Sequence, residues 1–332
     1  MSTQETYLKG IADAIRDKTG ETGTIQASQF ATKIAGIQTG AAAPSWKLYT
    51  MPVSTYWTSV CYGGGKFVAI SGSSNDNITA YSNSGTYWVK GTTLPGAYET
   101  WNSVCYGDGK FVAVAYASFA AYSTDGKTWT SSNMPGNRDW RSVCYGGGKF
   151  VAVCYDSMLP AYSADGITWS SARMPVSSGW ISVCYAGNKF VAIASSGITA
   201  YSADGINWTQ GGSLTTSNWI SVCYGGGLTV AISQSSNKCA YSVNNGVSWS
   251  EATMPTSADW ESVCYGDGKF VAVASDVNYA AYSTDGINWF TIALPATAYW
   301  RSVCYGDLAF IAVDYNSSNK CARIKDEYIP WA

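Results

Sequence analysis

The most informative stretch of the sequence is residues 140–153, which read WRSVCYGGGKFVAV. Its first six letters follow the pattern W-x-S-V-C-Y, and this pattern occurs seven times at intervals of 39 to 44 residues. The copies begin at Trp57, Trp101, Trp140, Trp180, Trp219, Trp260 and Trp300. Self-similarity at a period of about 40 residues indicates a repeat architecture in which each copy is one supersecondary unit.

Each copy predicts four short strands. In the copy at Trp140, residues 142–145 and 149–153 flank a glycine turn, and glycine permits the positive φ that a tight hairpin needs. Residues 161–163 and 167–170 flank a second turn of sequence Ala-Asp-Gly. Four-stranded units of about this length are typical of β-propellers. We therefore predict an all-β fold, a seven-bladed β-propeller.

The two ends of the repeat region complement one another. The copy that starts at Trp300 lacks the last strand of the unit, which carries a Trp and ends in Met-Pro. Residues 46–52, WKLYTMP, match that missing strand, with Met five residues after Trp as at Trp129, Trp169 and Trp249. We predict that residues 46–52 form the outer strand of the last blade, because this pairing closes the ring and removes two free sheet edges.

The first 45 residues differ from the repeats. A capping box at Ser2 and Glu5 and apolar residues at helical spacing predict short helices. We assign residues 1–40 to a small α-helical attachment or oligomerisation segment, residues 41–45 to a linker and residues 46–332 to the propeller. A segment this short is too small for a core of its own, so we expect it to dock on another copy, on the propeller or on a partner.

Composition narrows the chemistry. The 332 residues include no His, only 13% are charged, and the net charge is −2. Without His, Ser-His-Asp and Cys-His catalysis and His-bearing zinc sites are excluded. The charge argues against nucleic acid, no apolar run is long enough to span a membrane, and the N-terminus lacks the apolar core of a secretory signal. We expect no metal, no cofactor and production in a cytosol.

The repeated tryptophans and cysteines are interpreted as core. The seven pattern cysteines occupy one strand position, and a buried cysteine packs as a small hydrophobe, with metal binding as the minor alternative. Fourteen periodic tryptophans favour packing between blades over sugar stacking. Alternation along the strand predicts Trp, Ser and Cys on one sheet face and Val and Tyr on the other.

The turn Ser-x-Asp-Gly-x-x-Trp resembles the Asp-box of sialidase-like propellers, and Ser242–Trp249 fits the spacing of that box with Asn in place of Asp. In that family the box lies at the blade periphery, so the resemblance implies a structural role. The residues concerned are Asp125, Asp165, Asp204 and Asp285. Sialidase chemistry also needs three Arg around a carboxylate and a Glu that assists a Tyr nucleophile. Of the six Arg in this chain, Arg138, Arg141 and Arg301 could share one face but fall in blades far apart in order, and a Glu partner is equally hard to place. Glycosidase activity is therefore the least favoured function.

Variation among the copies is concentrated on one side of the predicted ring. The glycine turns and the Ser-x-Asp-Gly turns are nearly constant, whereas the loops after the second strand and the connections between copies all differ. These variable segments are rich in Tyr, Asn and Asp, a mixture suited to binding by ring stacking and adaptable hydrogen bonds. The candidate ligand-binding residues are Tyr98, Tyr116, Phe119, Arg138, Arg141, Tyr155, Asp156, Tyr279, Tyr299, Arg301 and Tyr315. The alternative is that the loops simply drift and that Tyr is common throughout.

Two stretches resemble proteins of bacteriophages and prophages. Phrases such as YGxGKFVAV and YSxDGxxW are similar to repeats in tail and receptor-binding proteins, and residues 11–20, IADAIRDKTG, are similar to a short module at the head of phage structural proteins. Together they imply a virion tail protein, assembled in the host cytoplasm and mounted on other virion proteins, or on a further copy, through residues 1–40. We expect a non-enzymatic adhesion module that binds a host-surface glycan or protein through the variable loops. A purely structural or decorating virion protein is the alternative.

Overall fold

The computed structural model describes most of the repeat region and a few residues outside it. The described residues are Ala12, Asp13, Ile15, Arg16, 45–72, 76–96, 99–155, 157–215, 218–316, 318–325 and Ile329. The chain divides into two compact units, Met1–Ser45 and Trp46–Ala332. In the first unit the four described residues before Ser45 have helical backbone conformation. No complete helix lies in the described part, and the rest of the predicted helical segment 1–40 lies outside it.

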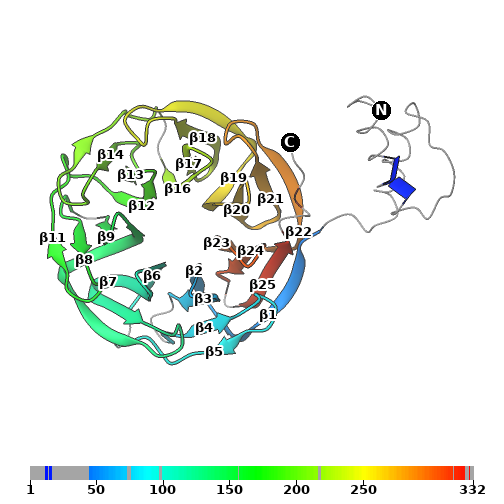
Figure 1. Cartoon of the computed structure of the whole chain (residues 1–332), viewed down its shortest axis with the longest axis horizontal. Helices are drawn as coiled ribbons and strands as arrows, with labels where there is room; N and C mark the ends of the chain where they lie inside the picture. Colours follow the sequence, from blue (N-terminus) through cyan, green and yellow to red (C-terminus); the bar gives the residue numbers. More distant parts are fainter. Residues whose placement is uncertain are drawn as a thin grey trace. The chain divides into compact units, whose positions relative to one another are not determined.

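The second unit consists of antiparallel sheets arranged in a ring (Figure 1). Two four-stranded sheets contain β2 (Trp57–Gly63), β3 (Lys66–Ser71), β4 (Thr79–Ser82) and β5 (Val89–Lys90), and β12 (Trp180–Ala186), β13 (Lys189–Ala194), β14 (Thr199–Ser202) and β15 (Thr209–Gln210). A six-stranded sheet contains β6 (Trp101–Gly107), β7 (Lys110–Ser123), β8 (Thr130–Gly146), β9 (Lys149–Cys154), β10 (Ala161–Ser163) and β11 (Ser170–Ser171). A seven-stranded sheet contains β16 (Trp219–Gly225), β17 (Leu228–Ser233), β18 (Ser236–Ser242), β19 (Ser250–Gly266), β20 (Lys269–Ser275), β21 (Val277–Ser283) and β22 (Phe290–Ala298). The last sheet contains β23 (Trp300–Gly306), β24 (Ala309–Asp314), β25 (Ser318–Lys325) and β1 (Lys47–Thr55). The all-β prediction is confirmed.

The two larger sheets arise because β8 and β19 each run through a boundary between repeats. The first part of β8 pairs with β7, whereas its last part, from Trp140 to Gly146, pairs with β9. Strand β19 does the same between β18 and β20. Each W-x-S-V-C-Y copy therefore begins a new set of antiparallel strands. This holds even in β8 and β19, where the copy continues the same strand as the segment before it.

The predicted pairing of the two chain ends is present. Strand β1 pairs with β25, with Leu48 opposite Ala322 and Tyr49 opposite Cys321. Met51 is 1% exposed and packs in a cluster with Trp57 and Cys321. The first strand of the repeat region thus completes the sheet formed by the last three, and the edge of β25 is covered.

The prediction of which strand residues share a face is wrong for tryptophan. In the copy at Trp140, Trp140 pairs with Cys154 but Ser142 pairs with Val153, which is a β-bulge at the intervening residue. The same shift occurs in all seven copies. One extra residue in a strand moves all side chains beyond it to the opposite face of the sheet. Trp140 consequently packs on the same side as Val143, away from Ser142.

The constant serine of the pattern joins each copy to the next. Ser59 Oγ accepts the backbone N–H of Val104 at 3.1 Å, and the last copy returns to the first because Ser302 Oγ accepts the N–H of Val60 at 3.1 Å. The other five copies make the same bond at 3.1–3.2 Å. A hydroxyl at this position satisfies a backbone donor that the neighbouring sheet leaves unpaired.

The core lies between successive sheets. The seven pattern tryptophans are at most 1% exposed. The second tryptophan of each repeat, which lies at its last strand, is also buried, except Trp249, which is half-buried. Cys144 packs with Trp180 of the following copy. Burial raises the pKa of the Cys184 thiol to about 12, so the thiol stays neutral. The interpretation as core is confirmed for the tryptophans. Of the seven pattern cysteines only Cys304 is buried, and the other six are partly buried and pack against the core clusters. No helix in the described part of the chain is long and apolar enough to cross a membrane.

Candidate functional site

The Ser-x-Asp-Gly turns are held together by their own side chains. Asp165 Oδ1 accepts the backbone N–H groups of Ile167 and Thr168 at 2.8 and 2.7 Å, and Ser163 Oγ donates to the same oxygen at 2.9 Å. The same contacts recur around Asp125, Asp204 and Asp285. Each carboxylate is therefore occupied within its own turn, which is the arrangement that a structural role requires.

These turns make stability depend on pH. Desolvation alone would raise the pKa of Asp165, but the two N–H donors and the Ser163 hydroxyl lower it to about 2. A pKa depressed by folding contributes stability that is complete above the unfolded value of about 3.9 and is lost as the pH falls toward about 2. We expect the unfolding free energy of D165N to decline less steeply between pH 4 and pH 2 than that of the native chain.

The control for this prediction is present in the chain. Asn244 occupies the same place in its own turn and accepts the N–H of Ser248 at 2.9 Å without titrating. D165N is therefore expected to keep the hydrogen bonds of the turn and to lose only the uptake of a proton by the side chain at low pH. Denaturant unfolding monitored by fluorescence at several pH values measures this, and identical slopes for both proteins would contradict the assignment.

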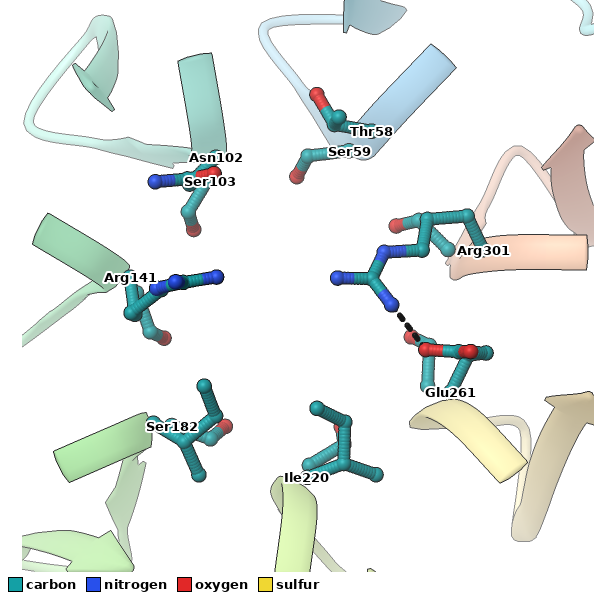
Figure 2. A pocket seen from close by; sticks show the side chains of 14 residues that line it. Thr58, Ser59, Asn102, Ser103, Arg141, Ser182, Ile220, Glu261 and Arg301 are labelled. Carbon is teal, nitrogen blue, oxygen red and sulfur yellow. Dashed lines mark hydrogen bonds and ion pairs between the residues drawn. The ribbon is translucent and has the colours of Figure 1, made fainter. Parts of the chain in front are cut away.

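A different group of side chains meets at the axis of the ring. The bulge residue, x of W-x-S-V-C-Y, lines the same cavity of about 130 Å³ at the axis of the ring in each copy (Figure 2). The bulge residues are Thr58, Asn102, Arg141, Ile181, Ile220, Glu261 and Arg301, and all seven line this cavity together with the constant serines. A position that is variable among nearly identical repeats thus converges on one recess, which we call the axial recess.

The axial recess lies on the side of the ring that carries the variable segments. The residue that follows each second strand bonds back to the residue before the pattern Trp: Tyr155 N–H donates to Asp139 O, and Tyr315 N–H to Tyr299 O, both at 2.9 Å. The variable loops and the connections between copies therefore meet beside the bulge residues. The nearly constant glycine turns lie at the other end of the same strands.

Two arginines face one another across the axial recess. Arg141 and Arg301 come from the third and the last copies, and Figure 2 shows both guanidinium groups directed into the opening. Arg141 Nη2 is bonded to Asp139 Oδ2 at 2.6 Å, and Arg301 is bonded to Glu261. Each guanidinium also lies over a tyrosine ring of its own copy, Arg141 over Tyr155 at 5.4 Å and Arg301 over Tyr315 at 5.8 Å.

The other bulge residues of the recess differ in polarity from one part of its wall to another. Ile181 and Ile220 form an apolar arc, while Thr58 and Asn102 form a polar arc (Figure 2). Asn102 Nδ2 donates to Trp140 O at 2.7 Å, and Thr58 Oγ1 donates to Trp101 O at 2.8 Å. These bonds fix the two side chains and leave the amide oxygen of Asn102 as an acceptor.

Glu261 is arranged to hold its neighbours rather than to transfer a proton. Its carboxylate accepts hydrogen bonds from Gln234 Nε2 and Ser275 Oγ, both at 2.9 Å, as well as from Arg301. A carboxylate held by three donors of the protein is a poor general base. In the described residues, no cluster of three or more Cys, Asp or Glu that could hold a metal ion is present.

Four other residues predicted from the sequence do not line the recess itself. Tyr116 and Tyr299 are exposed, and Tyr315 packs against Tyr56 with ring centroids 5.2 Å apart. Phe119 is half-buried against the cluster around Trp101.

Four further predicted residues either do not line the recess or lie outside the described residues. Tyr279 is tied to Thr256 by a hydroxyl contact of 2.9 Å, and Arg138 donates to Ser157 Oγ at 2.8 Å without lining the recess. Tyr98 and Asp156 lie outside the described residues.

Neither the seven constant serines nor five of the seven bulge residues were predicted to line a site; these five are Thr58, Asn102, Ile181, Ile220 and Glu261. The signal for them is in the sequence, since x is the one freely changing position inside an otherwise constant phrase. Arg141 and Arg301 were predicted individually, but their distance in the chain gave no reason to place them together. The ring brings them together, because every bulge residue faces the same axis.

Fold and site together define a β-propeller with a polar recess at its axis. No protein-family model and no curated protein matches the chain. Solved structures do match: a streptogramin B lyase has a TM-score of 0.75 at 10% identity, covering 86% of this chain and 99% of its own. A catalytically inactive His-to-Ala variant of virginiamycin B lyase from Staphylococcus aureus, with quinupristin, has a TM-score of 0.74 at 11% identity over 85% and 99%. YCF48 bound to D1 peptide has a TM-score of 0.65 at 14% identity over 86% and 97%. At these identities the likeness concerns the propeller fold alone.

Proposed function

We propose that this chain is a non-enzymatic recognition module that binds its ligand at the axial recess and the variable loops around it. One observation carries the proposal: the bulge position is the variable position inside an otherwise constant W-x-S-V-C-Y phrase, and its seven residues all line one recess. Scaffold positions that repeat unchanged maintain the fold, so the positions that vary are free to contact a ligand.

We also infer that the ring has seven blades, one for each copy of the pattern. The seven serine-to-valine hydrogen bonds that lead from each copy to the next and back to the first support this count. So does the four-strand set of the last copy, which β1 completes. In a closed ring, residues of the third and the last copy can face each other across the axis.

Binding is favoured over catalysis by the chemistry of the recess. Virginiamycin B lyase is described as inactive when a histidine is replaced by alanine, and this chain contains no histidine. Of the charged groups in the recess, Arg141, Arg301 and Glu261, the one carboxylate is fully engaged by neighbouring donors. The arginines are suited to hold an anionic group, not to donate or accept protons at neutral pH.

We propose further that the chain serves as the adhesion module of a bacteriophage tail, with the host-cell surface as its target. The resemblance of its repeats and of residues 11–20 to phage proteins supports this role. Residues 1–40 would then be the mount on the virion, and the side of the ring with the axial recess would face the host.

The test is binding of the labelled full chain to envelope fractions from a panel of bacteria. We expect binding to at least one fraction, and we expect the triple variant Y116A/Y155A/Y315A to bind at least about tenfold more weakly, because exposed aromatic residues around a recess are typical binding hot spots. The matched control is Y87A: Tyr87 is 77% exposed but lies in a turn on the other side of the ring.

The outcomes separate the two candidate roles. Equal binding of the native chain and the triple variant, or a loss caused by Y87A, would contradict the assignment of the site. Absence of binding to every fraction would overturn the recognition role and leave a decorating virion protein as the better reading.

A further inference from the structure

If the axial recess binds a ligand, as proposed above, its two arginines indicate the chemical class of that ligand. The side chains of Arg141 and Arg301 are 35% and 34% exposed, whereas the side chains of their acidic partners are 14% and 6% exposed. Both guanidinium groups are directed into the cavity, which Asp139 does not line, while Glu261 lines it beside Arg301 (Figure 2). An Arg side chain has five N–H donors, so donors remain after the bond to one carboxylate.

The charges around the recess favour a ligand group with a single negative charge. Asp139 and Glu261 offset the two arginines, so the four groups together carry no net charge. A doubly charged phosphate would meet these acids without a compensating excess of positive charge. A carboxylate matches the planar fork of a guanidinium and carries one charge.

The remainder of the recess fits a sugar ring. Arg141 and Arg301 line the recess and lie over the rings of Tyr155 and Tyr315, which are themselves 44% and 37% exposed and can contact a ligand beside the recess. One arc is apolar, with Ile181 and Ile220, and the other offers hydroxyl and amide groups. A pyranose presents an apolar face and a rim of hydroxyls, which correspond to these two arcs.

We infer that the axial recess binds an acidic glycan, with the carboxylate of one sugar held between Arg141 and Arg301. The two arginines come from the third and the last copies and direct their guanidinium groups into the same opening (Figure 2), which is the arrangement that contact with one carboxylate requires. Loss of either guanidinium removes charge-assisted hydrogen bonds, which are the strong ones in such a site.

The experiment measures binding of the full chain to immobilised glycans in matched pairs. Each acidic oligosaccharide, such as an oligogalacturonate or an oligomer of sialic acid, is compared with its carboxyl-reduced twin. A peptide with a free C-terminal carboxylate and the same peptide as its amide form a second pair. Isothermal titration or biolayer interferometry gives the dissociation constants.

We expect at least one acidic glycan to bind about tenfold or more tightly than its reduced twin. R141Q and R301Q should each weaken that binding by about 10- to 100-fold, the range expected for lost hydrogen bonds to a charged group. R141K, which keeps the charge but not the fork, should fall between. The matched control is R173Q, since Arg173 is exposed and does not line the recess. Unchanged thermal melting of the variants excludes misfolding.

The outcomes distinguish this inference from the function on which it rests. Equal binding of acidic and reduced glycans, or acid preference that survives in R141Q and R301Q, overturns the carboxylate assignment while envelope binding stands. Binding of the C-terminal peptide acid without any acidic glycan overturns the glycan class. If no glycan binds but the envelope fractions do, the inference is overturned and the recognition role is retained.

Discussion

Replacing Met51 by Asp is expected to detach β1 and open the ring. Met51 is 1% exposed and packs against Trp57 and Ile311 in an apolar cluster, so the new carboxylate would have no partner. An uncompensated charge in such a place costs roughly 3–5 kcal/mol. Strand β1 is held to the rest of its sheet by β25 alone, so this strand is expected to come away before the other sheets unfold.

The measurement is hydrogen exchange resolved along the chain, together with denaturant unfolding. In M51D the amides of β25 that pair with β1, around Lys320 and Ala322, should lose protection, and the exposed edge should make the protein prone to association. The control is L48D in the same strand, because Leu48 is 46% exposed and a charge there remains in water. Equal protection of β25 in M51D and L48D would show that β1 does not fasten the ring.

Replacing Trp219 by Ala is expected to lower the unfolding free energy by about 3–5 kcal/mol, the usual loss for a fully buried tryptophan. Trp219 is 1% exposed and lies in a cluster with Val222 and Leu214. The loss combines the transfer of the side chain to water and the cavity left between two sheets that cannot close it.

A second tryptophan of the same cluster provides the comparison. Trp249 packs against this cluster but is only half-buried, so W249A should cost distinctly less. Denaturant unfolding of both variants under the same conditions gives the two free energies. Equal losses would mean that the periodic tryptophans are not ranked by burial, and that the core between the sheets is not what stabilises the repeat.

Much of the fold follows from the sequence because the repeat supplies its own internal comparison. The position of Met51, five residues after Trp46 as in three other copies, together with the strand missing from the last copy, was enough to predict that β1 completes the last sheet. The bulge could not be predicted, because strand alternation assumes one residue per pairing step, whereas Trp140 and Ser142 pair with adjacent residues of β9. That single extra residue decides which side chain points to the axis.

The candidate site was predicted only in part, again by comparing the copies with one another. Tyr155 and Tyr315 were found because they lie in segments that vary visibly between copies. Glu261 and Asn102 lie inside the constant phrase, where a single variable residue gives no sign of a function. The axial recess that they line forms only when all copies are placed around a ring. Contacts such as that of Arg301 with Glu261 depend on which copies are neighbours, which the closed topology specifies.

The pairing of β1 with β25 has a consequence for synthesis of the chain. Residues 47–55 leave the ribosome early, but their partner, residues 318–325, is made about 270 residues later. At about 5–20 residues per second, the first strand waits on the order of tens of seconds without its neighbour. During that interval it carries an apolar face and unpaired backbone groups, and the finished strands of other nascent chains are competing partners. The yield of native protein should therefore rise when translation is sparse enough to keep nascent chains apart.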